Sequence, residues 1–221
     1  MCEKRRARGR EVAQRYLSAG DALGWFEALY AEANGDPSII PWADLRPSAS
    51  LTAWLDRLAP VTKGTTALAI GCGLGDDAEE LARRGFETTA FDISPTAILW
   101  CRRRHPGSPV SYATADLLHP PLHWQGRFDF VLESYTLQVL PAALRLEAIR
   151  HVASFVAPSG VLLVIARARE ETDPKGAMPW PVTRRELDAF QALGLKQAGF
   201  EDYWDKEDPP VRRFRVSYQR A

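Results

Sequence analysis

Cysteine is scarce in this chain of 221 residues, which contains three: Cys2, Cys72 and Cys101. They are odd in number, lie far apart and form no CxxC pair, so the sequence indicates neither a disulfide framework nor a zinc cage. We therefore expect a cytoplasmic protein that has no metal site.

Long apolar runs and an excess of one charge are also lacking. No stretch of about 18 apolar residues could span a bilayer, and no apolar run typical of a signal peptide follows the basic start MCEKRRARGR. The 28 Lys and Arg balance the 28 Asp and Glu, so neither nucleic acid nor a membrane is an expected partner. The basic start has no interleaved aromatic residues, which favours a disordered, solvated tail over residues 1–20 rather than an RNA contact.

From residue 65 onward, short apolar runs alternate with helical patterns, as in βαβ units that build a parallel sheet. The run VLLVIA (161–166) is the most continuously apolar, so we expect it in the sheet centre. KQAGFEDYW and RRFRVSYQ alternate polar with apolar residues and predict an antiparallel pair. The chain length fits one domain. The other expected elements are strands at 66–70, 87–91, 110–113 and 128–132 and helices at 76–84, from 95, at 142–156 and near 184–193.

Residues 21–62 show two helical stripes separated by a proline-containing loop that presents Trp42. Core packing against the sheet is the simpler interpretation of both stripes. Their members are Trp25, Phe26, Leu29 and Tyr30 in the first stripe and Leu51, Trp54, Leu55 and Leu58 in the second.

A glycine-rich turn, LAIGCGLGDD, follows the first expected strand. Gly71, Gly73 and Gly75 allow a sharp turn and the close approach of a ligand to the backbone. Asp92 ends the second strand 21 residues after Gly71, close to the spacing at which an acid reaches ribose hydroxyls. Ser94 is already placed to cap the next helix, which makes a capping role for Asp92 the weaker alternative.

Two carboxylates distinguish this turn from a dinucleotide fingerprint. Asp76 occupies the place of the third glycine, and Asp77 follows it. A pyrophosphate at this helix N-terminus would meet a repulsion on the order of a few kcal/mol. S-adenosylmethionine has a ribose and a positive charge but no phosphate, so it avoids that conflict. Helix capping by Asp76 and Asp77 is compatible with this interpretation.

With these motifs the sequence resembles the class I S-adenosylmethionine-dependent methyltransferases from about residue 20 onward. The resemblance implies a Rossmann-like, doubly wound α/β sheet of about seven strands, mostly parallel with an antiparallel C-terminal strand. It implies that the glycine turn lines the methionine portion, that Asp92 binds ribose, and that Asp116 with Leu117 holds adenine. The carrying motifs are LAIGCGLGDD, FDIS, TADL, FDFVLES and APSGVLLVIAR, and the predicted cofactor site also includes Cys72, Asp77, Ile93 and Glu133.

Two short motifs, IIPWADL and GAMPWPVTRREL, are similar to the thiopurine and thiol methyltransferase branch. In that branch an N-terminal aromatic segment closes over the cofactor. The similarity implies a helical N-terminal lid over residues 21–62, with Trp42 as a cofactor-contacting lid residue, on a core of residues 63–221.

Glu133, Tyr135 and Arg167 follow the fourth and fifth strands, where acceptors bind in such sheets, and are candidates for positioning the acceptor. Arg167 could hold an anionic substrate or pair with Glu170 or Glu171. We predict methyl transfer to a small molecule, a thiol or another soft nucleophile, by a monomer or homodimer. A noncatalytic module that binds S-adenosylmethionine and a nicotinamide-dependent oxidoreductase are the alternatives.

Overall fold

The computed structural model describes residues 3–58 and 61–221. Met1 and Cys2 of the predicted tail, and residues 59–60 of the predicted lid, lie outside the described residues.

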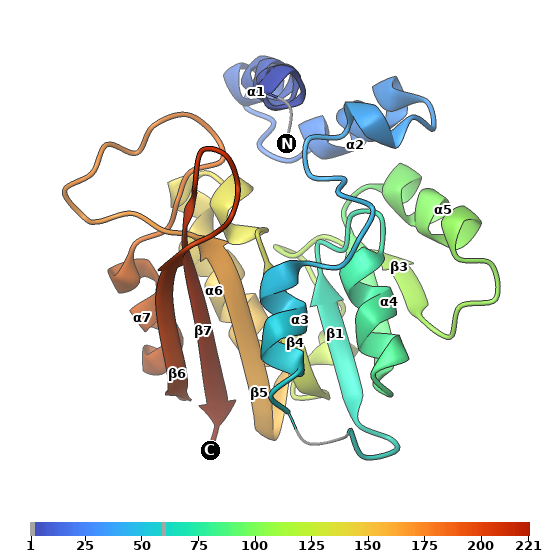
Figure 1. Ribbon diagram of the computed structural model, residues 1–221, viewed down its shortest axis with the longest axis vertical. Coiled ribbons are helices and arrows are strands. Elements are labelled where there is room, and N and C mark those ends of the chain that lie inside the picture. The colour runs from blue at the N-terminus through green and yellow to red at the C-terminus, as the bar shows by residue number, and fades with distance from the viewer. Residues whose placement is uncertain (1–2, 59–60) are drawn as a thin grey trace.

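A seven-stranded sheet runs through the molecule in the order β3-β2-β1-β4-β5-β7-β6 (Figure 1). All neighbouring strands are parallel except that β7 is antiparallel to both β5 and β6, which confirms the predicted mixed sheet. The middle strand is β4, so the apolar run 161–166 of β5 lies one strand away from its expected place. The strands are β1 Thr66–Ile70, β2 Glu87–Asp92, β3 Ser111–Thr114, β4 Phe128–Ser134, β5 Val156–Arg167, β6 Leu195–Trp204 and β7 Arg212–Arg220.

Helices cover both faces of the sheet because successive strand residues point to opposite sides. In β5, Leu162 and Val164 pack in the cluster that contains α6 and α7, whereas Leu163 and Ile165 pack with α3, α4 and α5. The β5 run is apolar throughout for this reason. The helices are α1 Glu3–Ser18, α2 Gly24–Ala33, α3 Ala49–Leu55, α4 Asp76–Arg83, α5 Pro95–Arg104, α6 Ala142–Phe155 and α7 Arg184–Ala192, with short 3-10 turns at Pro37–Ile39, Leu122–Trp124 and Leu137–Val139.

The predicted disordered tail is wrong for residues 3–18, which form α1. Val12 and Ala13 are buried against α2, and Arg8 and Arg15 both pair with Glu32. Basic residues dominate α1 and only a few apolar side chains anchor it, so its sequence shows no clear apolar face. Figure 1 shows α1 and α2 beyond one end of the strands, above the sheet and not on its faces.

The two N-terminal stripes have different partners. Leu51 and Leu55 of α3 pack on the sheet, as the core interpretation predicts. Trp25 and Leu29 of α2 instead form a separate cluster with α1 and with Trp100 of α5. Only the second stripe therefore belongs to the core of the sheet, and its last member, Leu58, is exposed and does not share that packing.

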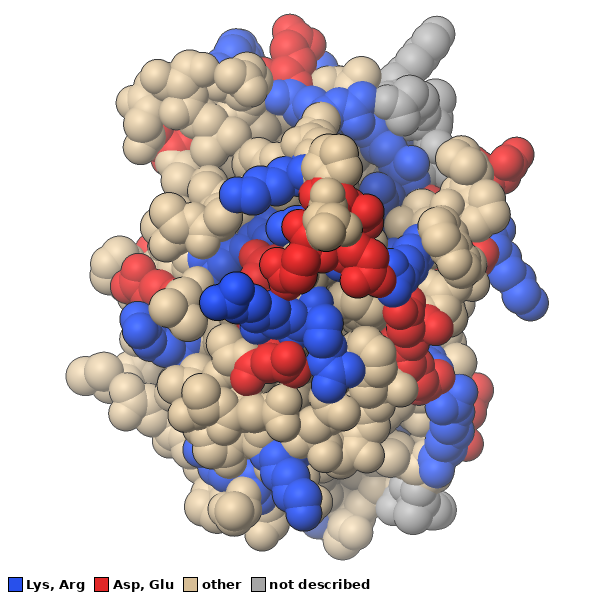
Figure 2. Space-filling view, turned by 90° about the vertical axis from the view of Figure 1, so that its left-hand side faces the viewer, with Lys and Arg blue, Asp and Glu red and all other residues tan. Residues whose placement is uncertain are grey.

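Strand β6 forms an exposed edge of the sheet. Figure 2 looks onto this side of the molecule and shows acidic side chains grouped among basic ones. Arg212 pairs with Asp202 and Glu170, and Arg215 pairs with Glu201. Charged side chains on an edge strand oppose pairing with a strand of another molecule. In the described part of the chain, no helix combines the length and the apolar character needed to cross a bilayer.

Candidate functional site

A cavity of about 500 Å³ lies at the carboxyl ends of β1, β2, β4 and β5. The strand order reverses between β1 and β4, and ligands of open α/β sheets bind at such a switch point. The volume is in the range of small-molecule sites. The wall is completed by the loop before α3, by α1 and α2, and by the turn between β6 and β7, which we call the β6–β7 turn (residues 205–211).

The glycine turn forms one wall of the cavity. Gly71 and Gly73 have φ values of 58° and 56°, in the left-handed region that favours glycine. A Cβ atom on Gly73 would lie 3.3 Å from the hydroxyl of Tyr30 and 3.5 Å from Nε1 of Trp42. Gly75 lies outside the cavity lining, where a Cβ atom would come within 2.5 Å of the Tyr112 hydroxyl. The predicted contact of Gly75 with the cofactor is thus replaced by a packing role.

Asp92 links the glycine turn to the end of β2. Its Oδ2 accepts a hydrogen bond from the Gly73 amide at 2.9 Å, and its Oδ1 accepts one from the Ser94 amide at 3.0 Å. Burial raises the pKa of Asp92 to about 6. A carboxylate oxygen has two lone pairs, so each oxygen retains an acceptor position for a ribose hydroxyl. Ser94 caps α5 through the Ala97 amide, as expected.

The two carboxylates after the glycine turn each have a partner in the protein, which the sequence did not indicate. Asp76 pairs with Arg104 at 2.9 Å, which compensates its charge. Asp77 accepts a hydrogen bond from the Ser48 amide at 2.6 Å, and burial raises its pKa to about 6. The repulsion of a pyrophosphate is therefore weaker than two unpaired charges would give, and it comes mainly from Asp77.

Asp116 and Leu117 line the cavity beyond β3, with Ile93 nearby. Asp116 accepts a hydrogen bond from the Leu118 amide at 2.8 Å, and its Oδ2 lies 2.8 Å from Nδ1 of His119. This contact raises the pKa of the exposed His119. The aspartate is thereby oriented at the end of the cavity where adenine is expected.

Trp42 contacts the glycine turn from the opposite wall. Its Nε1 donates a hydrogen bond to the Tyr30 hydroxyl at 2.7 Å. Phe26 and Cys72 line the same cavity, whereas Trp25 is fully buried away from it. Tyr30 supports Trp42 from behind and does not line the cavity, and its helical spacing is that of an ordinary packing position.

Glu133 does not line the cavity, which corrects its predicted contact with cofactor or acceptor. Its side chain is fully buried, and its Oε1 accepts hydrogen bonds from the amides of Thr136 and Leu137 at 2.7 and 2.9 Å. Burial raises its pKa to about 7. Glu133 thus holds the turn after β4 in place from behind the wall.

Tyr135, in that turn, does line the cavity. Its φ of 65° is unusual for a residue with a Cβ atom, and its amide donates a hydrogen bond to the Ile165 carbonyl at 2.9 Å. The guanidinium of Arg213 lies 4.8 Å from its ring centre. The two anchors formed by Glu133 and Ile165 keep Tyr135 in this conformation.

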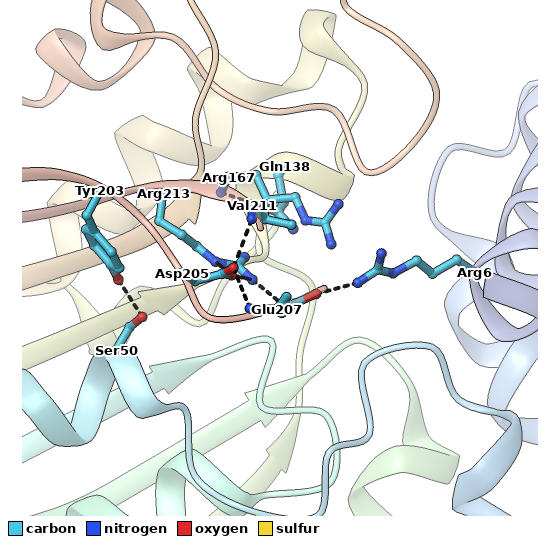
Figure 3. Close-up of polar contacts among 9 residues, drawn as sticks. All are labelled: Arg6, Ser50, Gln138, Arg167, Tyr203, Asp205, Glu207, Val211 and Arg213. Atoms are coloured by element: carbon cyan, nitrogen blue, oxygen red, sulfur yellow. Dashed lines mark hydrogen bonds and ion pairs between the residues drawn. The ribbon is translucent and has the colours of Figure 1, made fainter. Parts of the chain in front are cut away.

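Arg167 lines the cavity at the end of β5, and Glu170 pairs with Arg212 instead. The Arg167 amide donates to Oε1 of Gln138 at 2.7 Å. Beside it, Arg213 binds Asp205 and Glu207, and Glu207 also binds Arg6 of α1 (Figure 3). Sequence patterns could not reveal this cluster, because 201 positions separate Arg6 from Glu207.

Among residues 3–58 and 61–221, no group of three or more His, Cys, Asp or Glu is arranged to hold a metal ion.

Residues 67–160 match the model of a family described as "Methyltransferase domain". An 81-residue stretch is 38% identical to magnesium-protoporphyrin O-methyltransferase of Rhodobacter capsulatus. The match spans about a third of that relative, 35% of each chain.

Solved structures share the fold over most of the chain. The N-methyltransferase NodS of Bradyrhizobium japonicum, in complex with S-adenosyl-L-homocysteine, has a TM-score of 0.68 at 20% identity and covers 87% of this chain and 96% of its own. The [4+2]-cyclase SpnF has a TM-score of 0.68 at 16% identity, with 96% of both chains covered. At these identities the likeness establishes the class I methyltransferase fold, which carries more than one activity.

Proposed function

We propose that this protein is an S-adenosylmethionine-dependent methyltransferase that acts on a small molecule. The observation that carries the proposal is the contact between the Gly73 amide and the buried Asp92 at the wall of the cavity. It joins a side-chain-free surface to a carboxylate that lines the cavity. The family match over residues 67–160, which includes both residues, supports the proposal.

The cavity fits such a cofactor in three respects. Gly71 and Gly73 expose backbone to the cavity, and the turn can pack this closely only without side chains, because a Cβ atom on Gly71 would strike Thr136. Asp92 faces the cavity with acceptor capacity for two ribose hydroxyls. Asp116 stands farther along the same wall, where its carboxylate can accept from an adenine amino group.

Bound S-adenosylmethionine supplies a methyl group on a sulfonium, whose departure in an in-line displacement leaves a neutral thioether. The tasks of the protein are alignment and exclusion of water. Trp42 and Tyr30 cover the glycine turn, and Glu133 and Ile165 hold Tyr135 on the acceptor side. In this proposal α1, α2 and the loop before α3 act as the lid, whereas α3 belongs to the core of the sheet.

Titration calorimetry with S-adenosylhomocysteine tests cofactor binding directly. We expect saturable binding by the wild-type protein and a loss of at least about tenfold in affinity for Asp92→Asn, which removes a charged acceptor of the hydroxyls. Asp129→Asn is the matched control, since Asp129 lies at the start of β4 and binds Thr66 far from the cavity. Absence of wild-type binding at millimolar concentration would refute the proposal.

We further propose a thiol or another soft nucleophile as the acceptor, in keeping with the motif similarity to the thiol branch. In the described part of the chain the cavity lining contains no histidine, and a thiolate needs little help from a base. Release of S-adenosylhomocysteine is expected with aromatic thiols and not with the matching phenols. Turnover of phenols or amines alone would reject this acceptor class, and tight binding without any turnover would favour the noncatalytic alternative.

A further inference from the structure

Three arginines and two carboxylates meet at the acceptor end of the cavity (Figure 3). Arg213 lies 2.7 Å from Asp205 and 2.6 Å from Glu207, and Arg6 lies 2.6 Å from Glu207. Arg167 is the third arginine. The two carboxylates are thus shared between Arg6 and Arg213, and Arg167 is left as a half-buried positive charge, beside the exposed Lys206 that also lines the cavity.

Arg167 carries that unbalanced charge. Within residues 3–58 and 61–221, no carboxylate forms an ion pair with its guanidinium, and its hydrogen bonds to Gln138 and Val182 use its backbone amide and carbonyl. Burial and the neighbouring Arg6 and Arg213 lower the pKa of Arg167, and the nearby Glu207 and Asp205 only partly offset this effect. A half-buried cation without a partner is costly unless an anion approaches it.

The position of Arg167 separates it from the expected cofactor contacts. It ends β5, two residues after Ile165, whose carbonyl binds the Tyr135 amide. Asp92 ends β2 and Asp116 follows β3, on the other side of the switch point. Arg167 therefore faces the part of the cavity left for the acceptor.

We infer that the methyl acceptor carries a compact oxyanion, such as a carboxylate, and that Arg167 determines this specificity by binding it. The inference rests on the proposed function and names the substrate class of that site. A guanidinium presents two parallel N–H donors that match the two oxygens of a carboxylate, and charge-assisted pairs of this kind are stronger than neutral hydrogen bonds. Asp205 and Glu207 keep Arg6 and Arg213 occupied, so the anion is directed to Arg167.

The test uses the full chain saturated with S-adenosylhomocysteine and compares benzoate with benzamide, its neutral counterpart, by ligand-observed NMR titration. Wild-type protein should bind benzoate roughly ten- to hundredfold more tightly than benzamide, the effect of one charge-assisted contact. Phenyl phosphate is the third probe, and the tighter of the two anions identifies the oxyanion. Arg167→Gln should abolish the preference, and Arg167→Lys should retain part of it.

Arg103→Gln is the control for loss of one charge, because Arg103 is exposed on α5 and does not line the cavity. Melting curves establish that each variant folds. Equal binding of benzoate and benzamide by the wild-type protein would overturn the inference and leave the proposed cofactor binding unaffected. An undiminished preference in Arg167→Gln, or a selective loss of S-adenosylhomocysteine affinity in that variant, would also overturn it. Failure of the wild-type protein to bind S-adenosylhomocysteine would instead overturn the proposed function.

Discussion

Glu133 has no exposed surface, and its Oε2 has no hydrogen-bond partner among the described residues. Its pKa is raised to about 7 from an ordinary 4.5 because burial disfavours the charged form. The folded protein therefore binds more protons than the unfolded chain between these pH values. The stability contributed by Glu133 is present in full below pH 4.5 and is lost as the pH rises through 7.

Replacing Glu133 with Gln should remove this part of the pH dependence, because the amide keeps the Oε1 acceptor for Thr136 and Leu137 but cannot ionise. Above pH 7 the variant is spared a penalty of up to about 3 kcal/mol. Urea unfolding between pH 4.5 and 8 measures the effect, with the exposed Glu87→Gln as control. A Glu133→Gln curve parallel to that of the wild type would contradict this account.

Asp92 gives ligand binding its own pH dependence. Its pKa is about 6 in the free protein, and donation from two ribose hydroxyls favours the charged form. S-adenosylhomocysteine should therefore bind more tightly as the pH rises from 5 to 7 and level off above that. Asp77, whose pKa is also about 6, could give binding a similar pH dependence. If Asp92 is the cause, the Asp77→Asn variant should keep the pH dependence of binding. Calorimetry at several pH values decides between the two residues.

Among the elements, α2 and the loop before α3 are joined by a side-chain hydrogen bond from Trp42 to Tyr30. Trp42→Phe removes this donor and keeps an aromatic ring against the glycine turn. We expect a loss of about 1 kcal/mol in the free energy of binding S-adenosylhomocysteine, with a smaller effect on the free energy of unfolding. Tyr30→Phe is the reciprocal variant, and non-additive effects in the double mutant would measure the bond.

Hydrogen-exchange protection of the N-terminal helices α1 and α2 tests the proposed lid. Hydrogen exchange of the amides of α1 and α2 should slow when S-adenosylhomocysteine binds, whereas exchange in α7, which lies on the face of the sheet, should change little. Equal slowing in all three helices would indicate global stabilisation and argue against a lid.

At the scale of the whole molecule, the order of elements was readable from local patterns. The apolar runs of β1, β4 and β5 and the alternation in β6 follow which faces of each strand are covered. In β7 the alternation does not, because Arg213 and Arg215 are buried as well. The sheet order could not be read in the same way. β4 lies at the centre of the sheet because β1 pairs with it on one side and β5 on the other.

Local sequence was sufficient to place the glycine turn after β1, Asp92 at the end of β2 and the Ser94 cap, since backbone conformation and short spacing dictate them. It could not distinguish Glu133, which faces the interior, from Tyr135, which faces the cavity two residues later. Nor could it show that α1 folds or that Arg167 lacks a partner. Those outcomes depend on contacts between residues distant in sequence, such as Arg6 with Glu207, which exist only once the chain has folded.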